Sequence, residues 1–261
     1  MNDRKRAVRY GISFVILAVL LIFLFIWNVN SGSIHLSVQE ILNIIFRHQG
    51  DETSYNIVWE IRLPRILSVI ILGGALSVSG FLLQTFFNNP IAGPFVLGIS
   101  SGAKLIVAFL MIFLLSRSVS IGSGAMILAA FAGSMISMGF VLLVAKKVHN
   151  MSMLVISGVM IGYICSAITD FVVTFADDSN IVNLHNWSLG SFSGMTWGNV
   201  RTMAVVVLLT MVIVFFMSKP ISAYQLGETY AQNMGVNIKV FRILLILLSS
   251  ILSACVTAFA G

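Results

Sequence analysis

Charged side chains are scarce in this sequence. They make up 9% of its 261 residues, with 15 basic and 9 acidic side chains, whereas soluble domains carry about 25%. So few charges cannot cover a water-facing surface, and the composition excludes an ordinary soluble enzyme. Disorder is also excluded, because it requires many charges and few apolar residues, and 58% of this chain is apolar. Lipid is therefore the solvent for most of the chain.

Side chains that build metal and redox sites are also few. The two cysteines, Cys165 and Cys255, lie far apart in apolar stretches, so neither a disulfide framework nor a thiolate metal site is expected. The four histidines are scattered among polar segments: His35, His48, His149 and His185. No Gly-x-x-x-x-Gly-Lys-Ser/Thr phosphate loop and no His-Glu-x-x-His motif occurs. We expect no enzyme activity, and no metal or cofactor bound by this chain.

Long apolar runs, in contrast, recur along the whole chain. A membrane helix needs about 20 mostly apolar residues. We predict an all-α polytopic transmembrane bundle with about seven spans, at residues 7–29, 63–87, 95–115, 124–145, 153–175, 201–217 and 240–261. The first run is longer than a signal-peptide core, so it is expected to remain as a helix.

The basic residues predict the orientation of these spans. With a cytoplasmic N-terminus, nine of them fall inside: Arg4, Lys5, Arg6, Arg9, Lys146, Lys147, Lys219, Lys239 and Arg242. Five fall outside: Arg47, Arg62, Arg65, Arg117 and Arg201. This bias is the one that cytoplasmic loops of membrane proteins show. The net charge of +6 therefore indicates membrane orientation and not a nucleic-acid partner.

Two polar segments interrupt the single transmembrane domain formed by residues 1–261. Residues 30–61 are expected to form an outer loop with an amphipathic helix at the membrane interface. The apolar side chains of that helix are Leu36, Val38, Ile41, Leu42, Ile44, Ile45 and Phe46. Residues 218–239 are expected to form a polar, helix-capable cytoplasmic segment. The stretch between residues 176 and 200 is expected to be polar and without a span.

The most informative stretch begins with Arg-Leu-Pro-Arg at residues 62–65. A helix rich in small residues follows, which includes Gly80 and is expected to end at Gln84, and the chain then turns at Asn89 and Pro90. Residues 89–103 read Asn-Pro-Ile-Ala-x-Pro-x-x-Leu-Gly-Ile-Ser-Ser-Gly-Ala. In this order, these elements resemble the permease subunits of ABC importers for iron-siderophores, haem and vitamin B12, the FecCD/BtuC type.

Three later segments agree with this resemblance. Residues 154–166 look like the family's fifth helix, residues 187–194 like its outer loop before helix six, and residues 219–236 like its cytoplasmic coupling segment. The resemblance implies ten helices per subunit and a chain that continues past Ala-Gly into further helices. This sequence ends at Gly261, so we expect a C-terminally truncated gene or a fragment. Asp170 stands where the family usually has a small hydroxyl or apolar residue.

The resemblance implies a set of partners. Such permeases act as homo- or heterodimers in the bacterial plasma membrane, with the translocation path between the two permease subunits. Two ATPase subunits bind the cytoplasmic face and hydrolyse ATP, and an extracytoplasmic substrate-binding protein docks outside. Arg62 and Arg65 match arginines that meet acidic residues of the binding protein, and guanidinium groups can grip carboxylates through two hydrogen bonds. The alternative for both is interfacial anchoring or a salt bridge to Glu60.

The cytoplasmic segment is implied to contact the ATPase through Leu226, Gly227, Glu228 and Gly235. Gly227 permits a tight turn, and the acidic Glu228 favours the beginning of a helix. The alternative is a plain solvated loop.

The fifth predicted span carries Gly158, Gly162, Ser166 and Asp170 at intervals of four residues. This spacing places them on one helical face. A Gly-x-x-x-Gly pair favours helix contact, and a carboxylate within a span usually faces water or a partner. We expect this face to line the dimer seam or translocation path or to pack helices, and expect the same of Gly80, Gln84, Asn89 and Pro90.

The sequence therefore predicts the permease subunit of an ABC importer for an iron-siderophore, haem or a corrinoid. One alternative is a stand-alone secondary transporter, which intramembrane ion pairs would favour, although only Lys104 and Asp170 are available for one. A second alternative is a truncated, non-functional remnant. A membrane enzyme would need a polar constellation at membrane depth, and none is found. The substrate does not follow from these residues, and the resemblance implies that selectivity lies mainly in the binding protein.

Overall fold

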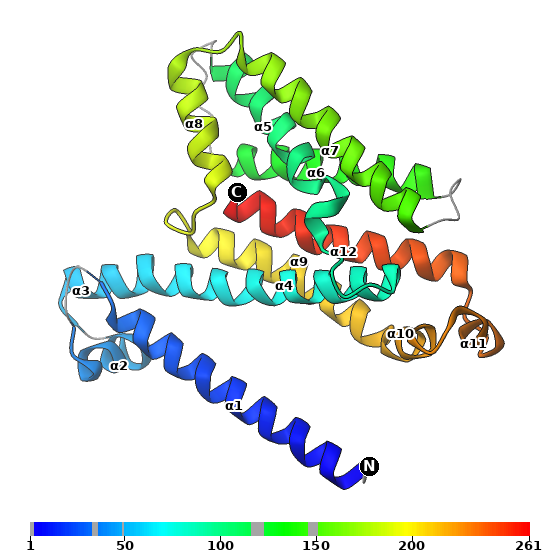
Figure 1. Cartoon of the computed structure of the whole chain (residues 1–261). Helices are drawn as coiled ribbons and strands as arrows, with labels where there is room; N and C mark the ends of the chain where they lie inside the picture. The colour runs from blue at the N-terminus through cyan, green and yellow to red at the C-terminus, as the bar shows by residue number, and fades with distance from the viewer. Residues whose placement is uncertain (1–2, 33–35, 49, 116–122, 146–150) are drawn as a thin grey trace. The chain divides into compact units, whose positions relative to one another are not determined.

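The computed structural model describes residues 3–32, 36–48, 50–115, 123–145 and 151–261. All regular structure in these ranges is helical (Figure 1), so the predicted all-α class is confirmed. His35, Arg117, Lys146, Lys147 and His149, which entered the predictions above, lie outside the described residues.

Twelve α-helices are described, here in chain order: α1 (Asp3–Asn30), α2 (Val38–Arg47), α3 (Glu52–Asn56), α4 (Leu63–Phe87), α5 (Ile99–Leu115), α6 (Ser123–Ala145), α7 (Met151–Val173), α8 (Asp178–Leu189), α9 (Trp197–Phe216), α10 (Ser218–Gln225), α11 (Glu228–Asn233) and α12 (Ile238–Ala260). Six helical segments are long and apolar enough to cross a membrane, and the shorter apolar helix Ile99–Ile112 corresponds to the third predicted span, 95–115. The predicted number of about seven spans is confirmed in this sense.

The helix boundaries differ from those of the predicted spans by up to four residues. The helix expected to end at Gln84 continues to Phe87, and a π-helical turn, Ile57–Arg62, precedes it directly. The third span begins at Ile99 and not at Phe95, because Pro94–Leu97 forms a 3₁₀ turn that ends at Gly98 with a φ of +69°. The polar stretch after residue 176 contains α8, which was not predicted. This helix is mostly polar. It is held in place because Leu184 is buried in an apolar cluster to which α5 also contributes.

The described residues divide into two compact units. The first comprises Met1–Val69 and Ser193–Val200, and the second comprises Ile70–Phe192 and Arg201–Gly261.

The first unit has a small apolar core around α2. Its buried members are Val29, Leu36, Ile41, Ile44, Val58, Leu63 and Ile66. A capping box begins α2, in which the Glu40 amide donates to the Ser37 hydroxyl at 3.2 Å and the Ser37 amide donates to the Glu40 carboxylate at 2.8 Å. The apolar side chains of this amphipathic helix are divided between the core and the surface. Ile41 and Ile44 pack inside the protein, while Leu42 and Phe46 stay exposed.

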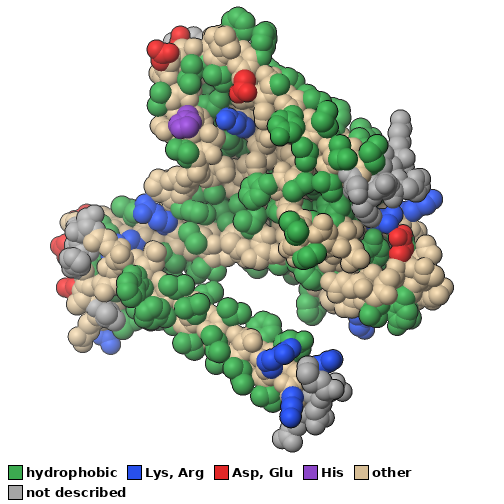
Figure 2. Space-filling model, in the orientation of Figure 1, with side chains coloured by type: hydrophobic (Ala, Val, Ile, Leu, Met, Phe, Trp, Pro, Cys, Tyr) green, Lys and Arg blue, Asp and Glu red, His purple; other side chains and the backbone are tan. Residues whose placement is uncertain are grey.

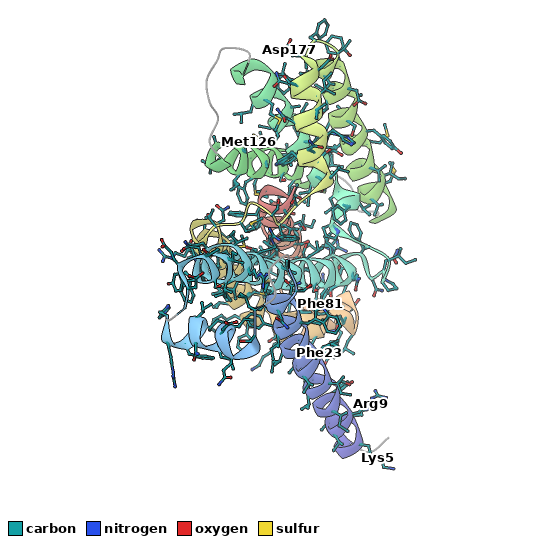
Figure 3. The ribbon with its side chains drawn as sticks, turned by 90° about the vertical axis from the view of Figure 1, so that its left-hand side faces the viewer. Lys5, Arg9, Phe23, Phe81, Met126 and Asp177 are labelled. Atoms are coloured by element: carbon teal, nitrogen blue, oxygen red, sulfur yellow. The ribbon has the colours of Figure 1, made fainter. Side chains whose placement is uncertain are left out.

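Helix α1 contributes to this core only near its C-terminal end, and the rest of the helix lies outside it. Only 6% of its apolar window is buried, and exposed hydrophobic side chains cover it in Figure 2, with basic side chains at its N-terminal end. Figure 3 places Lys5 and Arg9 near that end and Phe23 further along the helix. A helix that is apolar all round belongs in lipid or among other helices.

The second unit is built on α5, α6, α7 and α12. Helix α5 packs against α6, α7 and α8, and α12 packs against α6 and α5 (Figure 1). Gly102 of α5 and Gly133 of α6 face each other so closely that a Cβ on either residue would meet the carbonyl oxygen of the other. Small residues of this kind let backbones approach in a membrane, where packing holds helices together.

Three buried hydroxyl groups join α4 to α12 in this unit. The Ser79 Oγ lies 2.8 Å from the Ser249 Oγ and 2.6 Å from the Ser253 Oγ. The Ser249 hydroxyl also donates to the Ser79 carbonyl oxygen at 3.1 Å. Because a buried polar group without a partner is costly in hydrocarbon, these bonds fix the register of the two helices.

We expect Ser79→Ala to lower the free energy of unfolding in detergent micelles by about 1 kcal/mol, the scale of an interhelical side-chain bond in a membrane. The matched control is Ser77→Ala on the same helix, because the exposed Ser77 hydroxyl donates within α4, to the Gly73 carbonyl at 2.9 Å. Thermal unfolding of the two purified variants measures the difference. Equal stability would contradict the role given to the hydroxyl cluster.

Candidate functional site

The segment between α9 and α12 folds into the two short helices α10 and α11. Gly227 joins them with φ +128° and ψ 146°, a conformation that is essentially reserved for glycine. Helix α11 begins at Glu228 and is followed by Gly235, whose φ is +85° and whose amide donates to the Gln232 carbonyl at 2.9 Å. Both glycines are therefore needed for the path of the backbone.

Side-chain hydrogen bonds tie this segment to α12 and α4. The Arg242 Nη2 lies 2.9 Å from the Glu228 Oε2, and the Arg242 Nε donates to the Tyr224 hydroxyl at 3.3 Å. The Gln225 side-chain amide donates to the Thr85 hydroxyl at 3.2 Å. The segment is thus a folded element of the second unit and not a plain solvated loop.

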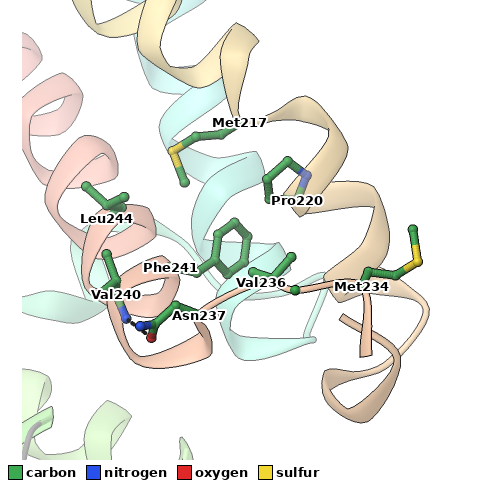
Figure 4. Close-up of a pocket in the computed structure, with 9 residues that line it drawn as sticks. Met217, Pro220, Met234, Val236, Asn237, Val240, Phe241 and Leu244 are labelled. Carbon is green, nitrogen blue, oxygen red and sulfur yellow. Dashed lines mark hydrogen bonds between the residues drawn. The ribbon is translucent and has the colours of Figure 1, made fainter. Parts of the chain in front are cut away.

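The surface of the segment is apolar and hollowed. Leu226 is 72% exposed and Met234 is 65% exposed. Two open hollows of about 400 Å³ each flank the segment. Figure 4 shows the first, lined by Met217, Pro220, Met234, Val236, Asn237, Val240, Phe241 and Leu244. Exposed apolar surface with hollows is typical of a protein-binding face.

Arg62 has a structural position in the first unit. It is buried, and its Nη1 donates to the Val29 carbonyl at 2.6 Å. Val29 belongs to the last turn of α1, where backbone carbonyls have no partner inside the helix. A Cβ on Gly32 would clash with the guanidinium group. Arg62 therefore caps α1.

Arg65 is less completely engaged. It is half-buried, and its Nη2 donates to the Ser193 carbonyl at a long 3.4 Å. Its buried Nε has no hydrogen-bond partner among the described residues. A guanidinium group offers five N–H donors. Arg65 thus keeps hydrogen-bonding capacity that Arg62 has already used in part.

The face of α7 predicted from its spacing divides into two parts. Gly158 and Gly162 lie against the 3₁₀ turn and Gly98, so that a Cβ on Gly158 would come within 2.9 Å of the Val96 carbonyl. The Ser166 hydroxyl donates to that of Ser101 at 3.5 Å. The first three residues therefore pack α7 against α5 and the turn before it, whereas Asp170 is exposed.

The predicted residues around the end of α4 shape a turn. The Asn89 amide donates to the Gln84 carbonyl at 3.1 Å, and the Asn89 side-chain oxygen accepts from the Ile91 amide at 2.9 Å. Pro90 between them is exposed, as is the Gln84 side chain. A Cβ on Gly80 would meet no described atom within 4 Å, so that position is open in the described part of the chain.

Comparison with known proteins identifies the family. Residues 20–261 match the FecCD transport family. The chain belongs to this family. It is 30% identical to the hemin transport system permease protein HmuU of Yersinia pestis, across 94% of this chain and 72% of that relative. It is 32% identical to the vitamin B12 import system permease protein BtuC of Vibrio parahaemolyticus, across 100% of this chain and 75% of that relative.

A solved structure agrees with this membership. An ABC transporter described as metal-chelate type, in an inward-facing conformation, superposes with a TM-score of 0.81 and 26% sequence identity, covering 94% of this chain and 74% of that one. The FecCD chain is therefore a multi-pass membrane permease of an ABC importer of the metal-chelate, haem and vitamin B12 class, and not an enzyme. Membership implies a separate ATPase subunit. Among the described residues, no group of three or more His, Cys, Asp or Glu side chains could hold a metal ion.

The sequence analysis missed several residues of this FecCD permease that the structure brings together. Ser79, Ser249 and Ser253 are far apart in the chain, and only the four-residue spacing of the last two within an apolar helix hinted at a polar contact. Ser191, whose amide donates to the Ala260 carbonyl at 2.7 Å, follows Gly190 in the Trp-Ser-Leu-Gly motif. Arg242 had been counted only as a cytoplasmic charge.

We expect Gly227→Ala to strain the turn between α10 and α11 by about 1–3 kcal/mol, because an L side chain there requires a rare backbone conformation. Amide hydrogen exchange at residues 228–233 should become roughly tenfold faster. Gly93→Ala serves as the control, since Gly93 has an ordinary φ of −137° and open space around its Cβ position. Unchanged exchange in the Gly227 variant would contradict this account.

Proposed function

We propose that this FecCD permease carries a metal chelate of the iron-siderophore type, or the related haem or a corrinoid, through the plasma membrane. The order of family motifs, matched across residues 20–261, is the observation that supports this substrate class most directly. The similarity to a hemin permease and a vitamin B12 permease supports the two related substrates. The N-terminus lies in the cytoplasm in this proposal, as the basic residues predict.

Residues 218–239 are the proposed contact with the ATPase. They form two short helices that carry exposed apolar side chains beside two hollows. Leu226 and Gly227 form the turn, Glu228 begins α11 and Gly235 follows its end with a positive φ. A folded, apolar projection of this kind suits a groove on a partner protein. ATP hydrolysis on that partner would then power the permease.

Residues 30–61, together with Arg62 and Arg65, are the proposed outer face for the substrate-binding protein. Arg65 is the better candidate for a direct contact, because its side chain is partly exposed whereas Arg62 is buried. Arg62 stabilises the same unit, since it caps α1. A carboxylate of the binding protein would complete the hydrogen bonding of Arg65.

A second permease subunit, identical or different, is the remaining proposed partner. The exposed Asp170 of α7, with Gly80, Gln84, Asn89 and Pro90, is proposed to face the dimer seam or the path. A carboxylate at such a position is explained by water or a partner.

The test is reconstitution of the chain with its paired ATPase and binding protein in liposomes. We expect the ATPase to co-purify, and uptake of one labelled substrate among an iron-siderophore, haem and cobalamin to require ATP. Uptake without the ATPase would instead indicate a stand-alone secondary transporter. An assembled complex that takes up none of the three would indicate a non-functional remnant.

We expect Arg65→Ala to weaken docking of the binding protein about tenfold, because a hydrogen bond to a charged group contributes about 1.5–3 kcal/mol. Surface plasmon resonance on the reconstituted permease measures the dissociation constant. Arg9→Ala is the control, because Arg9 is an exposed arginine of α1 that lies outside the proposed docking face. Equal affinity of wild type and the Arg65 variant would remove Arg65 from the docking face.

A further inference from the structure

Arg242 is the side chain that gathers the two short helices onto α12. It lies in the second turn of α12, and its guanidinium group reaches α11 through Glu228 and α10 through Tyr224. The two distances are 2.9 Å to the Glu228 carboxylate and 3.3 Å to the Tyr224 hydroxyl. One group thus contacts both helices on either side of the Gly227 turn.

A packed pair of aromatic rings and a further hydrogen bond lie beside the contacts of Arg242. The Tyr224 ring lies 5.2 Å from the Phe241 ring, and both side chains are buried. Gln225, the residue after Tyr224, is bonded to Thr85 at the end of α4. The backbone at Gly227 can rotate more freely than its neighbours, because glycine has no Cβ to restrict φ and ψ.

We propose that Arg242 is a positioning residue, which sets the angle between α10 and α11 and so holds the ATPase-contacting surface in its docking shape. This inference rests on the proposed function of residues 218–239. In this proposal Glu228 affects ATPase binding by its contact with Arg242, and it makes no contact with the ATPase itself.

Energetics support an orienting role over a stabilising one. The Arg242 side chain is 29% exposed and that of Glu228 is 42% exposed, and ion pairs with this much exposure contribute little to stability. A guanidinium group nevertheless constrains direction, because its donors form a rigid planar fork. The pair therefore selects one arrangement of α11 while adding little to the free energy of folding.

In the arrangement that the Arg242–Glu228 pair selects, three large side chains are exposed. Leu226, Tyr230 and Met234 are 72%, 47% and 65% exposed, and all three line the same hollow as Lys219. Without the Arg242 contacts, α11 could rotate about Gly227 and separate Tyr230 and Met234 from Leu226. Binding of a preorganised surface avoids this ordering cost.

A charge-swap experiment on the assembled importer tests the proposal. We expect Glu228→Arg and Arg242→Glu each to weaken ATPase binding and transport-coupled ATP hydrolysis roughly threefold to tenfold, the range of coupling seen between residues in contact. The double variant E228R/R242E should return both to within about twofold of wild type, since the pair is re-formed with its charges exchanged. The Tm of each variant should stay near that of wild type.

The controls separate this proposal from its alternatives. Lys5→Gln, which removes an exposed basic charge near the N-terminus, should change nothing, and it is compared with Arg242→Gln. If the double variant stays as defective as Glu228→Arg while wild type binds the ATPase, Glu228 meets the ATPase directly and the proposal is overturned. If wild type itself binds no ATPase, the proposed function fails and this inference fails with it.

Variants that do not fold are handled by conservative replacements. Arg242→Lys keeps the charge but cannot span Glu228 and Tyr224 with a planar fork. It should weaken ATPase binding less than Arg242→Gln, with an unchanged Tm. Equal ATPase affinity of Arg242→Lys, Arg242→Gln and wild type would overturn the positioning role.

Discussion

Helices in lipid lack the hydrophobic force that joins them in water, so they are held by close packing and by hydrogen bonds between side chains. The second unit of this permease depends on both. Gly102 and Gly133 bring α5 and α6 into backbone contact, and the Ser79 hydroxyl bonds α4 to α12 through Ser249 and Ser253. Everything that α12 carries is positioned by these contacts.

Helix α12 carries a different contact at each end. Near its beginning, Arg242 holds α10 and α11. At its other end, the Ala260 carbonyl accepts from the Ser191 amide in the loop after α8. Helix α12 therefore makes side-chain contacts with α10 and α11 near its beginning and a backbone contact with the loop after α8 at its end.

The first unit has only a small apolar core, and hydrogen bonds from its polar groups stabilise its helix ends. The capping box of α2 and the bond from Arg62 to the end of α1 satisfy backbone groups at helix ends. Trp197 adds a bond from its indole nitrogen to the Trp59 carbonyl at 2.9 Å. Arg65 differs from Arg62 in that it is only partly buried and makes one long bond, to the Ser193 carbonyl.

The long apolar runs could be predicted from the sequence, because lipid imposes a minimum length on any helix that crosses it. The family was equally visible in the order of its motifs, from Arg62 to Gly235. The helix α8 was not visible, because its sequence is polar and its stability comes from one buried face around Leu184. The role of Gly158 and Gly162 stayed open between a path and a packing contact until the turn at Gly98 was seen against them.

The sequence by itself determined the solvent of this protein, its helical class, the approximate spans and the family to which it belongs. Only the tertiary structure decided that Arg62 caps a helix while Arg65 stays available, and that Arg242 binds Glu228 and Tyr224 at once. The reason is physical. Hydropathy and turn chemistry are local properties of the chain, whereas a side-chain partner is chosen by where distant helices are packed.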